Sequence, residues 1–142
     1  MKEDKILKHL PIVSRQVKRK MDEVFQKFNL TSTQAFTLKF IEENSKIKKV
    51  YAKDIENEFD MRRATVAGII QLMEQNELIE RSSESTDARM KEITLTRKAL
   101  DKEYSIDLEM KKLEKQITKN ISKEELTNFF DTLNKISMNL LE

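Results

Sequence analysis

The stretch RRATVAGIIQLMEQ, residues 62–75, holds Gly68, the only glycine of the 142-residue chain. At about 100° per residue, its apolar side chains gather on one face of a helix, and Gly68 lies nearly opposite them. A glycine inside a helix costs about 1 kcal/mol relative to alanine. The predicted core face consists of Val66, Ile69, Ile70 and Met73, and the predicted outward face is small and uncharged around Gly68: Ala64, Thr65, Ala67, Gln71 and Gln75.

A bare helical face of this kind suits insertion into a groove of double-stranded DNA. Small residues let the backbone approach the bases, glutamine bonds adenine bidentately, and an alanine or threonine methyl group can touch a thymine methyl. Arg62 and Arg63 stand at the N-terminal end, placed for phosphates or a guanine edge, and the N-terminal amides favour phosphate. The alternative is that Gly68 is a tolerated surface residue with generic polar neighbours. The predicted recognition surface is Arg62, Arg63, Ala64, Thr65, Ala67, Gly68 and Gln71.

The residues around this helix predict a winged helix-turn-helix. Downstream, LIERSSESTDARMKEITLT (78–96) has two short apolar runs on either side of a polar tip, which indicates a β-hairpin. Asn76 is expected to end the helix in a left-handed conformation. Upstream, Thr31 and Gln34 form a capping box that starts one helix, and YAKDIENEF (51–59) predicts another.

Long amphipathic helices are predicted at both ends of the chain. Apolar residues recur at intervals of three and four from Ile6 to Phe28, and Pro11 either kinks this helix or starts a new one. Thr96 caps a long helix, and Ser122 with Glu125 forms the capping box of the last one. The fold class is therefore mainly α with a small β-hairpin wing. Within one domain overall, residues 31–98 are the expected DNA-binding lobe, and residues 1–30 and 99–142 are the helical region of a homodimer.

Composition excludes several other functions. The chain has 27 basic and 25 acidic residues, so any attraction to DNA must come from local charge. With no cysteine and only one histidine, His9, we expect no disulfide, thiol switch, metal site or cofactor. No apolar run approaches about 20 residues, so we expect no membrane span and a cytoplasmic protein. A single glycine permits no glycine-rich phosphate loop, and an enzyme is not expected. A helical protein–protein interaction module with a degenerate winged helix remains the alternative.

Residues 60–96, DMRRATVAGIIQLMEQNELIERSSESTDARMKEITLT, resemble the recognition helix and wing of the MarR family of bacterial transcription regulators. The resemblance rests on Arg63 followed by Thr65-Val66, on LMEQNELIER, on Asp87-x-Arg89 and on ITLT. The order of elements agrees along nearly the whole chain, and LTSTQAFTLKFI resembles the family's helix start. Family members often have serine near Ala64 and glycine at Glu77, and usually have glycine at Ala99. These departures bear on the operator sequence rather than on the fold.

The resemblance implies a homodimer that binds a pseudo-palindromic operator, commonly as a repressor, with half-site centres about 10 bp apart. It implies that the wing residues Asp87, Arg89 and Lys91 contact DNA, with Arg89 in the minor groove and Asp87 orienting arginine side chains. The alternative for Asp87 and Arg89 is a solvated loop pair.

The resemblance also implies release of DNA by a small anionic, often aromatic, molecule bound between the DNA-binding lobe and the dimer helices. Each candidate residue has a plainer alternative, which is core packing, or solvated surface for Arg15. The candidate pocket residues are Val13, Arg15, Val17, Phe36, Phe40 and Met73.

Overall fold

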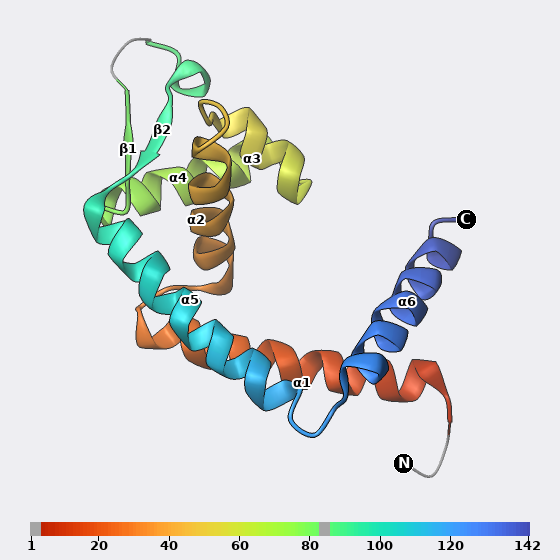
Figure 1. Ribbon diagram of the computed structural model, residues 1–142. Helices are drawn as coiled ribbons and strands as arrows, with labels where there is room; N and C mark the ends of the chain where they lie inside the picture. Colours follow the sequence, from red (N-terminus) through yellow and green to blue (C-terminus); the bar gives the residue numbers. More distant parts are fainter. Residues whose placement is uncertain (1–3, 83–85) are drawn as a thin grey trace. The chain divides into compact units, whose positions relative to one another are not determined.

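The computed structural model describes residues 4–82 and 86–142, apart from the side chain of Ala88. Helices make up most of this part of the chain, with one two-stranded antiparallel hairpin (Figure 1). The fold is therefore mainly α with a small β-hairpin wing, as the sequence predicts. The elements in chain order are α1 (Ile6–Lys27), α2 (Ser32–Ser45), α3 (Ala52–Phe59), α4 (Arg63–Gln75), β1 (Ile79–Arg81), the short 3₁₀ helix η1 (Ala88–Met90), β2 (Ile93–Leu95), α5 (Arg97–Ile117) and α6 (Lys123–Leu140).

The helix ends follow the capping signals of the sequence. The Oγ1 of Thr31 accepts the backbone N–H of Gln34 at 3.2 Å, and the Gln34 side chain accepts the N–H of Thr31 at 3.1 Å. Helix α1 runs continuously through Pro11, so no new helix starts there. The turn between α3 and α4 depends on Asp60, which has φ 49° in the left-handed region.

The predicted left-handed stop at Asn76 is wrong by one residue. Asn76 has φ −84°, and the left-handed residue is Glu77, with φ 60°. This conformation costs a residue with a Cβ about 1 kcal/mol. A tertiary hydrogen bond offsets the cost of this backbone conformation, because the Thr96 hydroxyl donates to the Glu77 carbonyl at 2.7 Å.

The chain divides into two compact units, Met1–Met110 and Lys111–Glu142. In the first unit, α4 packs against α3 and β1, α2 packs against α1 and β2, and η1 packs against α3 (Figure 1). The hairpin joins Ile79 to Leu95 and Arg81 to Ile93, and Val50 adds an isolated bridge to Ile93. The buried cluster of this unit draws on helices α1 to α5 and on both strands, and it includes Leu38, Ile41, Ile55, Val66, Ile70, Met73, Ile79 and Ile93.

The second unit carries α6, and its start is fixed by the predicted capping box. Ser122 Oγ accepts the N–H of Glu125 at 3.1 Å, and Glu125 accepts the N–H of Ser122 at 3.2 Å. No residue of α6 is buried within the chain. Over the residues that the structure describes, no helix is both long and apolar enough to cross a membrane. No group of metal-ligating side chains is found within residues 4–82 and 86–142.

Candidate nucleic-acid interface

Helix α4 is anchored by its apolar side and leaves the opposite side open. Val66, Ile70 and Met73 are at most 2% exposed, whereas Ile69 is half-buried. All seven residues of the predicted recognition surface are exposed: Arg62, Arg63, Ala64, Thr65, Ala67, Gly68 and Gln71. A Cβ added to Gly68 would meet nothing within 4 Å, and its φ is not in the left-handed region. Neither packing nor backbone conformation within the chain therefore requires this glycine.

The N-terminal end of α4 is suited to an anion. Arg62 is the N-cap residue and makes no side-chain capping bond, and the first turn contains no acidic residue. The first backbone N–H groups of a helix lack partners within the helix and carry the positive end of its dipole. With Arg62 and Arg63 exposed beside them, these groups form a cationic end that matches a phosphate.

The hairpin is fixed to α4 by an ion pair at its base. Arg81 of β1 donates from Nε and Nη2 to the two carboxylate oxygens of Glu74, at 3.1 and 2.8 Å. This bidentate bond lowers the pKa of Glu74, and the charge of Lys91 lowers it further. The same hydrogen bond raises the pKa of Arg81. The Arg81–Glu74 pair thus ties the base of the wing to α4.

Arg89 lies against α3 rather than projecting into solvent. Its Nη2 is 3.5 Å from Oε1 of Glu56, and its side chain is about one-third exposed. Asp87 is exposed and its Oδ1 accepts the backbone N–H of Arg89 at 3.0 Å, which stabilises the short turn of η1. The predicted wing residues Asp87, Arg89 and half-buried Lys91 are all described, whereas residues 83–85 of the predicted hairpin tip lie outside the described part of the chain.

Sequence reasoning missed Glu56, which is 7% exposed. Its Oε2 and the Nε of Arg89 are buried without a hydrogen-bond partner among the described residues. Lys53 also lies near this carboxylate, with its Nζ 3.9 Å from Oε1 of Glu56. An acidic residue beside Ile55 in a short amphipathic helix carries no signal of a partner 33 positions further along the chain.

A cavity of about 120 Å³ is lined by residues of both α4 and the wing. Arg63 and Ala67 of α4 and Arg89 of the wing all line it, so the structure brings these three predicted residues together. Three arginines and several apolar side chains therefore belong to one concave surface. The complete lining is Ala52, Glu56, Arg63, Ala67, Ile70, Arg81 and Arg89.

The predicted effector-pocket residues lie in different environments. Val13 is 40% exposed, Phe36 is 43% exposed, and Arg15 is exposed. Val17 and Phe40 are half-buried, and the rings of Phe40 and Phe59 meet edge to face at 5.9 Å. Met73 is completely buried, because it lies on the core face of α4 with Val66 and Ile70. Met73 is therefore a core residue in this structure.

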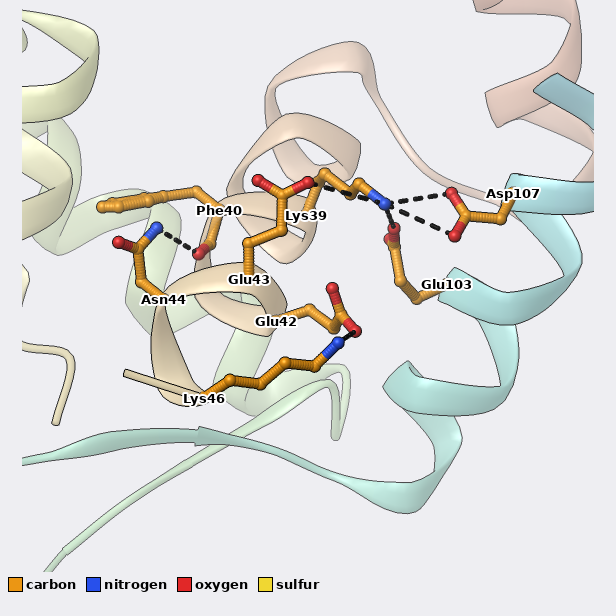
Figure 2. Close-up of polar contacts among 8 residues, drawn as sticks. All are labelled: Lys39, Phe40, Glu42, Glu43, Asn44, Lys46, Glu103 and Asp107. Carbon is orange, nitrogen blue, oxygen red and sulfur yellow. Dashed lines mark hydrogen bonds and ion pairs between the residues drawn. The ribbon is translucent and has the colours of Figure 1, made fainter. Parts of the chain in front are cut away.

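A polar cluster fixes α2 to α5, as Figure 2 shows. Lys39 Nζ lies 3.1 Å from Asp107 Oδ1, 3.5 Å from Glu103 Oε1 and 3.7 Å from Glu43 Oε1. Burial opposes the charge of Lys39, but its hydrogen bond with Asp107 and the charges of Asp107 and Glu103 outweigh burial and raise its pKa. Burial raises the pKa of Glu103, and the nearby Lys39 charge offsets only part of this effect.

These features define a winged helix-turn-helix protein. Helices α3 and α4 form the helix-turn-helix, α4 has an exposed outward face, and the hairpin that follows carries Arg89. The MarR family model matches residues 28–90. The transcription regulator MarR from Oenococcus oeni PSU-1 is 30% identical, with a TM-score of 0.68, and the match covers 94% of this chain and 99% of that one. This chain belongs to the MarR family of transcription regulators.

Two structures from Staphylococcus aureus share the fold at lower identity. One is a MepR–DNA complex, with 22% identity, a TM-score of 0.78 and 99% of each chain covered. The other is a MarR in complex with salicylate and kanamycin, with 21% identity, a TM-score of 0.77, and 94% of this chain and 87% of that one covered. A comparison with curated proteins gave no match.

Proposed function

We propose that this chain is a sequence-specific double-stranded DNA-binding repressor that acts as a homodimer on a pseudo-palindromic operator. Residues 31–98 serve as the DNA-binding lobe, and residues 1–30 and 99–142 form the dimerisation region. The observation that carries the proposal is the outward face of α4, exposed around Gly68 and free of acidic side chains in its first turn. The S. aureus MepR–DNA complex, which has the same fold, supports it. Such a protein works in the cytoplasm, where bacterial DNA lies.

The recognition helix and the wing have separate tasks in this proposal. Gln71 and Thr65 contact base edges in the major groove, and the small residues Ala64, Ala67 and Gly68 permit close approach. Arg62, Arg63 and the helix N-terminus hold phosphates. Asp87, Arg89 and Lys91 belong to the wing contact, in which a narrow minor groove attracts the guanidinium of Arg89.

The proposed effector is a small anionic or aromatic molecule. Salicylate bound to the S. aureus MarR supports this chemical class. Phe36 and Val13 offer exposed apolar surface, Arg15 is exposed as an anion partner, and Val17 and Phe40 are half-buried. Release requires the ligand to bind more tightly to a dimer whose recognition helices are wrongly spaced for DNA. Met73 is completely buried, so its proposed role is to support the pocket from the core without touching the ligand.

The test is selection of bound fragments from genomic DNA, followed by titration of the enriched site at several salt concentrations. We expect enrichment of a pseudo-palindrome and a linear loss of log affinity with log salt concentration, since phosphate contacts release counterions. Arg63→Ala should weaken binding about equally for all sequences and reduce the salt slope by about 1, because Arg63 contacts a phosphate. Failure to enrich any sequence, with protein partners captured instead, would favour the interaction-module alternative.

A further inference from the structure

A second polar cavity, of about 240 Å³, lies where the ends of three helices meet. It is separate from the recognition surface and from the proposed effector residues. Its lining comes from the segment after α1, from the segment after α4 and from the first turns of α5: Asn29, Leu30, Asn76, Leu78, Lys98 and Lys102. None of these six residues is acidic, although 25 of the 142 residues in the chain are.

Two ammonium groups are held in place beside this cavity. Lys102 Nζ donates to the carbonyl of Phe28 at 2.6 Å, and Lys98 Nζ donates to the carbonyl of Asn76 at 3.0 Å. Both carbonyls stand at helix C-termini, where cations are favoured. An ammonium has three N–H donors, so each lysine keeps donors for another acceptor. Lys98 and Lys102 are four residues apart on α5 and therefore share one face.

Among the described residues, no carboxylate forms an ion pair with either of these two lysines. Within residues 4–82 and 86–142, neither Lys98 nor Lys102 forms an ion pair, whereas lysines elsewhere in the first unit commonly do, as at Lys18, Lys39 and Lys48. Burial lowers the pKa of Lys102, and the charge of Lys98 lowers it further. Like charges at this spacing destabilise a helix. An anion between them would remove the repulsion.

The cavity wall also offers uncharged donors. Asn29 and Asn76 carry carboxamides, whose NH₂ groups can bond an oxygen acceptor. The backbone of Asn29 is fixed in the left-handed region, with φ 57°. Leu30 and Leu78 are 5% and 2% exposed and close the cavity on the core side. The volume of about 240 Å³ lies below the roughly 300–1,000 Å³ typical of sites for drug-sized ligands, which fits a small occupant.

We infer that this cavity binds a small oxyanion, either a phosphate or sulfate ion or the carboxylate of a small acid, held by Lys98, Lys102, Asn29 and Asn76. The bound anion would join the C-terminal end of α4 to α5. The site does not depend on DNA binding, so it can exist even if the proposed function is wrong.

The test is a titration of the full-length protein with inorganic phosphate, followed by ¹H–¹⁵N NMR of the Asn29 and Asn76 side-chain amides. Sodium chloride replaces phosphate at equal ionic strength in the reference samples. Parallel titrations with sulfate and with acetate separate a tetrahedral anion from a carboxylate. We expect saturable shifts of both amides with at least one of the three anions.

Lys98→Gln, at an exposed position, should weaken the affinity about tenfold or more, and Lys98→Arg should retain most of it. Lys111→Gln, at another exposed position of α5, is the matched control and should leave the affinity unchanged. Lys102→Gln provides a second variant. Shifts that do not saturate, or equal affinity in the wild type and Lys98→Gln, would overturn the inference. A loss of stability in Lys98→Gln without any dependence on anions would leave helix capping as the only role of the lysine.

Discussion

Glu56 and Arg89 form an incompletely bonded pair, since each has one buried polar atom without a partner. Glu56 therefore competes with DNA phosphates for the guanidinium of Arg89. We predict that Glu56→Gln strengthens non-specific DNA binding about two- to fivefold, because a partly exposed ion pair contributes up to about 1 kcal/mol. Fluorescence anisotropy with a labelled duplex at low salt measures the change.

The Arg89→Gln background is the control for this prediction. If the competition acts through Arg89, the gain from Glu56→Gln should disappear when both substitutions are combined. Weaker DNA binding by Glu56→Gln alone would contradict the competition and would show that Glu56 holds Arg89 in its bound position.

Glu103 makes the stability of the first unit depend on pH. Its pKa is raised by burial, in an environment that also includes Lys39, Asp107 and Glu42 (Figure 2). A carboxyl whose pKa is raised in the folded state binds its proton more tightly there, so stability is lost as the pH rises from the unfolded pKa, about 4.3, through the folded pKa. We predict that Glu103→Gln becomes progressively more stable than the wild type over this range.

Urea unfolding at a series of pH values from 4 to 8 checks this prediction. Glu58→Gln is the matched control, because it removes one carboxylate from an exposed position outside this cluster. A stability difference for Glu103→Gln that stays constant or falls with pH would contradict the burial argument.

At the scale of the element, the outward face of α4 separates stability from DNA binding. Gly68→Ala should stabilise the fold by about 0.5–1 kcal/mol, since alanine is the better helix former and its Cβ meets nothing within 4 Å. Gly68→Lys should leave the fold intact but abolish specific binding, because a long side chain keeps the helix out of the groove. Thermal unfolding and footprinting measure the two effects.

Gln116→Lys adds the same charge at an exposed position of α5 and should not affect the footprint. If Gly68→Lys still protects the same operator, the outward face of α4 does not enter the groove. If Gly68→Ala instead lowers the unfolding temperature, some contact at this position has been missed.

Local signals explain how much of the fold the sequence predicts. The capping boxes at Thr31 and Ser122 are complete within four residues, and both helices start where they indicate. The 3.6-residue period of α4 likewise identified its buried face. The sequence predicts the left-handed residue at Asn76 instead of Glu77, because the hydrogen bond that stabilises this conformation comes from Thr96, 19 residues away.

The same limit applies to the candidate site. The exposure of Ala64, Gly68 and Gln71 follows from the helical period, and Arg62 and Arg63 are exposed because they stand at the start of the helix. The position of Arg89 was not, because its partner Glu56 belongs to a different helix. The Arg81–Glu74 pair was also missed, since its partners lie on either side of the turn that ends α4.

At the scale of the whole molecule, large apolar side chains remain exposed on the terminal helices. Phe129 and Phe130 of α6 are 52% and 55% exposed, and Leu7 of α1 is 91% exposed. Exposed apolar surface of this extent marks an interaction surface. A symmetric pair buries the same surface from both copies, which supports the proposed homodimer.

We predict that the wild type has twice the mass of one chain in solution and that Leu133→Asp or Phe129→Asp produces monomers. A charge placed in an apolar interface must be desolvated without a partner, which costs several kcal/mol, and each 1.4 kcal/mol changes the dimer dissociation constant about tenfold. Light scattering after size-exclusion chromatography measures the mass. Because Leu133 is half-buried in the single chain and Phe129 is exposed, the second variant separates loss of dimer from loss of fold.

Asn128→Asp is the matched control, since it adds the same charge to α6 at an exposed position. It should remain dimeric, and circular dichroism should show equal helix content in all the variants. If the Phe129→Asp variant is still dimeric, this face of α6 is not part of the dimer interface. A monomeric wild type would contradict a symmetric operator complex altogether, because a single recognition helix reads only one half-site.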